Sequence, residues 1–62
     1  MERGQKVMVH AYPDRELERV VWQEYETYVA VCRPEVYRRA VKRGGEPESM
    51  MGFPKRDVAV IE

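Results

Sequence analysis

The chain has little that would support covalent or metal chemistry. Its 62 residues include a single cysteine, Cys32, and a single histidine, His10. One cysteine excludes an internal disulfide, and in a run of valines we expect it to be a small buried hydrophobic residue. The alternatives are a reactive thiol, a metal ligand shared within an oligomer, or an intermolecular disulfide. Zinc would need three ligands besides His10, and catalysis would need a partner group that the spacing does not offer. We therefore expect no enzyme, no metal and no cofactor.

Long hydrophobic runs and an excess of charge of one sign are also missing. No apolar run approaches the roughly 18 residues that span a bilayer, and the N-terminus lacks a signal-peptide core. Together with the unpaired cysteine, this favours a cytoplasmic protein without a membrane segment. Eleven basic and eleven acidic residues give no net charge. The sequence therefore lacks the overall basic character typical of a non-specific nucleic-acid binder.

The length of 62 residues predicts one small domain, 1–62, with a small core and modest stability. Residues 1–5 are polar and are expected to be frayed. The centre of the chain is the stretch 18–33, ERVVWQEYETYVAVCR, in which two apolar runs flank the polar segment 23–27. Valine, tyrosine and tryptophan suit strands, so this stretch predicts an antiparallel hairpin.

The hairpin has one irregularity, at the consecutive Val20, Val21 and Trp22. Strict alternation of inward and outward residues is broken there. Either both faces of the strand are covered, or a β-bulge shifts the register. The sequence leaves both alternatives open.

The other expected elements follow from periodicity and from proline and glycine. Strands are predicted over 6–12, 15–22 and 27–32, with short strands over 50–53 and 58–61. A helix is predicted over 34–43, because Pro34 suits the first helical position and Gly44 suits the end. Its apolar residues recur at helical spacing, with basic residues opposite.

This order predicts a mainly β protein with one α-helix, in which five strands form a small, partly open antiparallel barrel. The last residues, GFPKRDVAVIE, resemble the closing segment of Src-homology-3 (SH3) domains. In that family a Gly-x-Phe-Pro run leads through a 3₁₀ turn into a final valine strand. The resemblance covers about a fifth of the chain and implies an SH3-like barrel. The family's paired tryptophans are absent, so binding of proline-rich ligands is not implied.

Two groups of residues are candidates for binding. Trp22, Tyr25 and Tyr28 are either core residues or a surface platform, since aromatic side chains are enriched at interface hot spots. The basic residues of the predicted helix are either a solvated face or a patch for phosphate or an acidic partner; they are Arg38, Arg39, Lys42 and Arg43.

We rank a non-catalytic protein-interaction or regulatory module first, with another protein as its partner. The runner-up is a nucleic-acid-binding SH3-like barrel that uses the basic face of helix 34–43. Exposed barrel edges accept partner strands, including one from a second copy, so a weak homodimer is a further hypothesis. The fold alone does not decide between these functions.

Overall fold

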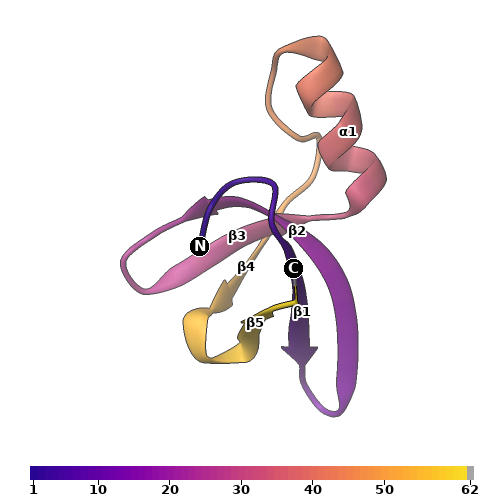
Figure 1. Cartoon of the computed structure of the whole chain (residues 1–62). Helices are drawn as coiled ribbons and strands as arrows, with labels where there is room; N and C mark the ends of the chain where they lie inside the picture. The colour runs from indigo at the N-terminus through magenta and orange to yellow at the C-terminus, as the bar shows by residue number, and fades with distance from the viewer. Residues whose placement is uncertain (62) are drawn as a thin grey trace.

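The computed structural model describes residues 1–61, which form a five-stranded antiparallel sheet curled into a half-barrel with one helix at one end (Figure 1). The strands are β1 (Lys6–Ala11), β2 (Arg15–Glu24), β3 (Tyr28–Cys32), β4 (Met51–Pro54) and β5 (Val58–Val60). The helix α1 spans Pro34–Arg43, and a 3₁₀ turn, η1, spans Lys55–Asp57. This is the mainly β, SH3-like, partly open barrel that the sequence predicts, with the expected order of elements.

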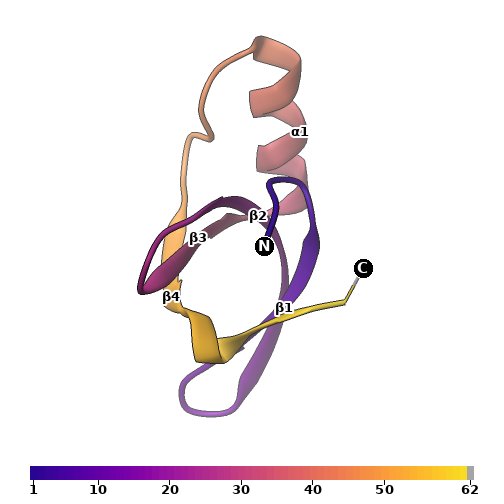
Figure 2. The same ribbon diagram turned by 60° about the vertical axis from the view of Figure 1, so that its left-hand side comes forward.

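The sheet order is β4-β3-β2-β1-β5, so β4 and β5 are its two edges. The first half of β2 pairs with β1, and its second half pairs with β3. Because one long strand serves two neighbours at its two ends, it has to bend between them. That bend curls the sheet into the ring seen end-on in Figure 2.

A β-bulge at Trp22 supports this bend. Val21 pairs with Val31, but the next partner pair is Gln23 with Ala30, which leaves Trp22 as an extra residue in β2. Bulges bend a strand and increase its twist. Of the two alternatives that the sequence left open, the bulge is therefore present. β2 runs on to Glu24, so the connection to β3 is shorter than the predicted 23–27.

The core consists of valines on the inner face of the curled sheet. Every second residue of β1 and β3 points inward, as strand geometry requires. The buried cluster comprises Val7, Val9, Val21, Val29, Val31 and Val58. Met1, the first residue of the chain, and Phe53, in β4, pack against this cluster. The core is thus built almost entirely from small β-branched side chains, which suit strands.

Helix α1 occupies the predicted residues and projects beyond the sheet (Figure 1). Val36 and Ala40 are buried, and Tyr37 packs edge-on against Trp22 at 6.0 Å between ring centroids. Val41 is 56% exposed, so the buried stripe is narrower than the apolar pattern suggests. Gly44 ends the helix with φ of 73°, a conformation that glycine adopts without strain. Within residues 1–61, no helix is long and apolar enough to cross a membrane.

Residues 1–5 lie along β2. The amide of Gly4 donates to the carbonyl of Val21 at 2.8 Å, and the amide of Val21 donates to the carbonyl of Gln5 at 3.0 Å. Arg3 also donates to the carbonyl of Trp22 at 2.6 Å. The expectation of a frayed end did not include these contacts, because it considered only the polarity of the segment. Polar residues here continue the backbone pairing of β2.

Candidate functional site

Two exposed tyrosines stack on each other where β2 turns into β3. The ring centroids of Tyr25 and Tyr28 are 4.7 Å apart and the ring planes differ by 17°. The turn holds this geometry, since the amide of Tyr25 donates to the carbonyl of Tyr28 at 2.8 Å. The two side chains remain 46% and 42% exposed. A pre-stacked aromatic pair of this kind offers contact area with little further loss of side-chain entropy.

The edge strand β4 lies beside this pair. Tyr28 is the register partner of Pro54, and Ala30 is the partner of Gly52. The ring of Tyr28 covers Gly52 so closely that a Cβ added there would lie 3.0 Å from the ring. β4 has a neighbour on one side only. The stacked tyrosines and the free side of β4 therefore form one continuous surface, which we call the tyrosine–β4 face.

Trp22, the third predicted aromatic, does not belong to this face. The guanidinium carbon of Arg3 lies 4.0 Å from the centre of its ring, and Tyr37 packs against the ring edge. Arg3 also donates to the side-chain oxygen of Gln23 at 2.8 Å, which fixes the guanidinium in place. The indole thus joins the N-terminal segment, β2 and α1. These internal contacts leave only part of its surface to a partner.

The basic residues of α1 are all exposed, as the sequence predicts for either of their two interpretations. Arg39 lies 3.7 Å from the carboxylate of Glu48, and Arg43 donates to the carbonyl of Glu46 at 2.8 Å. The segment after the helix therefore engages half of the group, and Arg38 and Lys42 complete the exposed set. The sequence also offers Lys55 and Arg56 as an extension of the patch, provided that their turn lies near the helix. That turn, η1, lies at the opposite end of the molecule from α1 in Figures 1 and 2, so the two residues do not extend the patch.

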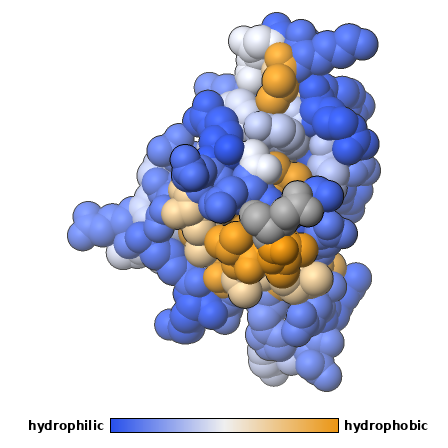
Figure 3. Space-filling model, viewed as in Figure 1, coloured by the Kyte–Doolittle hydropathy of each residue, from blue (hydrophilic) through white to orange (hydrophobic). Residues whose placement is uncertain are grey.

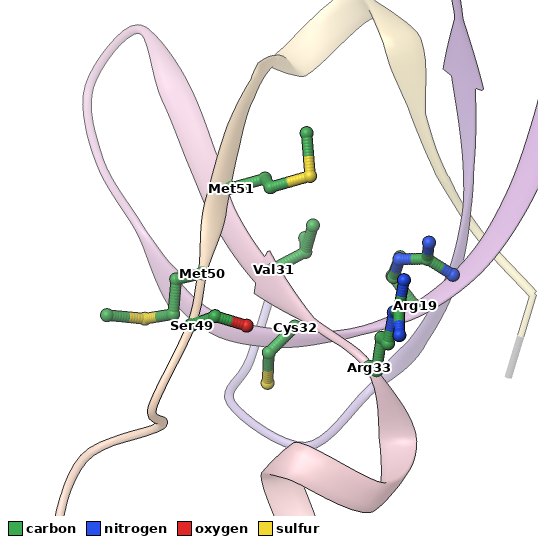
Figure 4. Close-up of a pocket in the computed structure, with 7 residues that line it drawn as sticks. All are labelled: Arg19, Val31, Cys32, Arg33, Ser49, Met50 and Met51. Carbon is green, nitrogen blue, oxygen red and sulfur yellow. The ribbon is translucent and has the colours of Figure 1, made fainter.

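A pocket of about 250 Å³ opens where β2, β3 and the start of β4 meet (Figure 4). Arg19 and Arg33 lie on one side of it, and Ser49, Met50 and Met51 lie on the other. Val31 and Cys32 complete the lining. The pocket combines two guanidinium groups with flexible apolar side chains. Such a lining suits an anionic group carried on an apolar or extended chain.

Cys32 is buried, as predicted, and its thiol lies 3.9 Å from the carbonyl oxygen of Val20. Burial raises the pKa of this thiol, which disfavours the reactive thiolate. His10 is exposed on β1, in register with Glu16 on β2. No three His, Cys, Asp or Glu side chains of the described chain are grouped so as to hold a metal ion.

A small apolar area surrounds the C-terminal end of β5. Figure 3 shows hydrophobic residues gathered there on a face that is otherwise mostly hydrophilic. Val60 and Ile61, at the end of β5 and directly after it, are both about half exposed. The amide of Ile61 donates to the carbonyl of Lys6 at 3.0 Å, which keeps the end of the described chain against β1. This second edge of the sheet carries no aromatic residue in β5.

Sequence reasoning missed the arginines of the pocket. Arg19 lies between Leu17 and Val21 in a strand whose alternate residues face inward, and its register partner in β1 is the buried Val7. The signal in the sequence that could have revealed the pocket was an arginine at a strand position that faces inward. Arg19 and Arg33 line the same pocket because Val20 pairs with Cys32. That register follows from the bulge at Trp22, which the sequence did not fix.

Comparison of the chain with protein-family models, with curated proteins and with solved structures found no match.

Proposed function

We propose that the protein is a non-catalytic interaction module that binds another protein through the tyrosine–β4 face. The observation that carries this proposal is the exposed stack of Tyr25 on Tyr28 beside an edge strand. Aromatic side chains dominate binding energy at protein interfaces. Edge strands offer unpaired backbone groups that an extended segment of a partner can join.

The two features complement each other physically. An extended peptide that pairs with β4 gains backbone hydrogen bonds but little selectivity. The tyrosine stack adds a rigid apolar contact next to that strand, and Gly52 leaves space for the Tyr28 ring because it has no side chain. The partner that fits best is therefore an extended segment with an apolar or aromatic residue opposite the stack.

We place this module in a cytoplasmic, reducing compartment. The motivation is Cys32, a buried thiol with no second cysteine in the sequence to pair with. A fractionation of the source cells, with detection of the protein in the cytosolic or the secreted fraction, tests this placement.

The proposed binding through the tyrosine–β4 face is tested by selecting peptides from a random library displayed on phage, with the full chain as bait. We expect selected peptides to bind with micromolar or tighter affinity and to lose at least tenfold on Tyr25→Ala combined with Tyr28→Ala. Loss of a hot-spot aromatic typically costs about 2 kcal/mol or more, which is about thirtyfold in affinity and exceeds this tenfold threshold. Isothermal titration calorimetry measures both affinities.

The chain provides a matched control in Tyr12, which is 93% exposed and stands outside the stack. Tyr12→Ala should leave affinity within about twofold of the parent. If the double tyrosine variant binds as the parent does, or if Tyr12→Ala costs as much, the tyrosine–β4 face is not the binding surface.

Nucleic-acid binding through α1 is the second candidate, and one observation favours it. Four basic side chains lie exposed on a helix that projects from the barrel, against one acidic residue, Glu35, in its first turn. The contacts of Arg39 with Glu48 and of Arg43 with Glu46 count against this function.

Replacement of Arg38 and Lys42 by glutamine tests nucleic-acid binding through α1. Single-stranded oligonucleotide binding should be steeply salt-dependent in the parent, and the slope of log affinity against log salt should fall by about one per lost phosphate contact. Equal and weak binding by both proteins rules this function out.

A weak homodimer is a further proposal, supported by the apolar area at Val60 and Ile61 on the free side of β5. Two such edges brought together would extend the sheet across both copies. Sedimentation equilibrium should show a concentration-dependent dimer that Val60→Lys abolishes. A monomer at all concentrations contradicts it.

A further inference from the structure

We propose that the pocket between Arg19 and Arg33 binds a carboxylate side chain of the partner, so that the module recognises acidic extended segments. This inference rests on the proposed function for the identity of the partner. The carboxylate site itself rests on the geometry of the pocket alone.

The strand register brings the two arginines together. Val20 pairs with Cys32 at the end of the β2–β3 ladder, and Arg19 and Arg33 are the next residues of the two segments beyond that pair. Like charges that face one space from neighbouring segments repel each other. Both side chains line the same pocket (Figure 4). An anion between them would remove the repulsion and accept hydrogen bonds from both guanidinium groups.

Within residues 1–61, most of the hydrogen-bonding capacity of this pair is unused. Arg19 donates one bond, from Nη1 to the carbonyl oxygen of Glu18 at 2.7 Å. That bond holds the guanidinium while leaving most of its five donors available. Neither arginine forms an ion pair with a carboxylate of residues 1–61. A carboxylate matches the planar donors of arginine in a way that a spherical ion does not.

The position of the pocket relative to β4 specifies where the acid must lie in the partner. Met51, at the start of β4, lines the pocket, whereas Tyr28 lies opposite Pro54 at the end of the strand. Three residues of a strand span about 10 Å. Arg19 shares the inner face with Val7, while Tyr28 precedes the inward Val29 and so faces out. Side chains three residues apart in an added strand point to opposite faces. The partner should therefore carry Asp or Glu about three residues from its contact with the tyrosines.

The pocket is tested with two small probes, N-acetylglutamate N-methylamide and its glutamine counterpart, at constant ionic strength. The full chain is observed through the arginine Nε–Hε signals in nuclear magnetic resonance spectra. We expect saturable shifts of Arg19 and Arg33 with the glutamate probe, at least tenfold weaker binding of the glutamine probe, and no comparable shift of Arg38. Arg33→Gln, at an exposed position, should weaken glutamate binding without loss of the fold. Equal effects of the two probes, or an equal shift of Arg38, overturn the carboxylate site.

The selected peptides then separate this inference from the proposed function. On the parent protein they should be enriched in Asp or Glu, and on Arg19→Gln combined with Arg33→Gln the enrichment should vanish. Peptides that need Tyr25 and Tyr28 but show no acidic preference refute the pocket inference and leave the proposed function standing. Binding of the glutamate probe at Arg19 and Arg33, with no peptide dependent on the tyrosines, supports the site and refutes the proposed function.

Discussion

Arg3 lies over the indole ring of Trp22, with its guanidinium carbon 4.0 Å from the ring centre. The same side chain donates to the carbonyl of Trp22 and to Gln23, so the N-terminal segment is attached to the bulge of β2. Cation–π contacts of this kind contribute about 0.5–1 kcal/mol at exposed sites. Trp22 therefore contributes to the stability of the fold, and Tyr25 and Tyr28 remain as the exposed aromatic pair.

Gly4 should be required for this attachment. It has φ of +94°, and a Cβ added to it would lie 2.9 Å from the hydroxyl oxygen of Tyr37. We expect Gly4→Ala to destabilise the protein by about 1–2 kcal/mol, through backbone strain and the close contact. Gly45→Ala is the control, because its added Cβ meets nothing closer than 3.9 Å. Urea unfolding measures both, and equal stabilities of the two variants would show that residue 4 does not need glycine.

The packing of α1 against the sheet should leave no room for a larger side chain at Ala40, which is fully buried. We expect Ala40→Leu to cost about 1–3 kcal/mol, because overpacking forces α1 away from β2. Val41→Leu, on the exposed side of the same turn, should change stability by less than about 0.5 kcal/mol. Thermal unfolding followed by circular dichroism distinguishes the two. A neutral Ala40→Leu would mean that α1 is not packed as described.

Cys32 should react slowly with thiol reagents. Its burial raises the thiol pKa, so less thiolate is present at neutral pH than in a free cysteine. Labelling of the native protein should therefore proceed only as fast as the chain opens, and labelling in urea should be rapid. Stoichiometric reaction of the native protein within seconds would contradict burial and revive the reactive-thiol interpretation.

Glu24 should make stability depend on acid pH. The N-terminal ammonium of Met1 lowers its pKa most, followed by Lys55, whose Nζ lies 3.1 Å from the carboxylate. A pKa lowered by folding means that the unfolded chain binds more protons in the acid range. The stabilisation is then present above the ordinary glutamate pKa and is lost as the pH falls through the lowered folded value. In urea unfolding from neutral to about pH 3, Glu24→Gln should flatten this loss and Glu26→Gln should not. Parallel curves for parent and Glu24→Gln would contradict the contact.

Local signals in the sequence predicted most of the fold. Pro34 and Gly44 mark the observed ends of α1, and the valine-rich segments mark the strands. What could not be predicted depends on long-range register. The contacts of residues 1–5 require β2 as a partner, and Arg19 meets Arg33 only because Val20 pairs with Cys32. The sequence also could not show that Arg3 covers Trp22 and leaves Tyr25 and Tyr28 exposed.

The most direct measurement of the central claim is amide hydrogen exchange of the protein with and without a selected peptide. The tyrosine–β4 face predicts that the β4 amides that point away from β3 gain protection and that Tyr25 and Tyr28 ring signals shift, while amides of β5 and α1 exchange as before. Protection confined to β5 or to α1, with the β4 amides and both tyrosines unchanged, would contradict it.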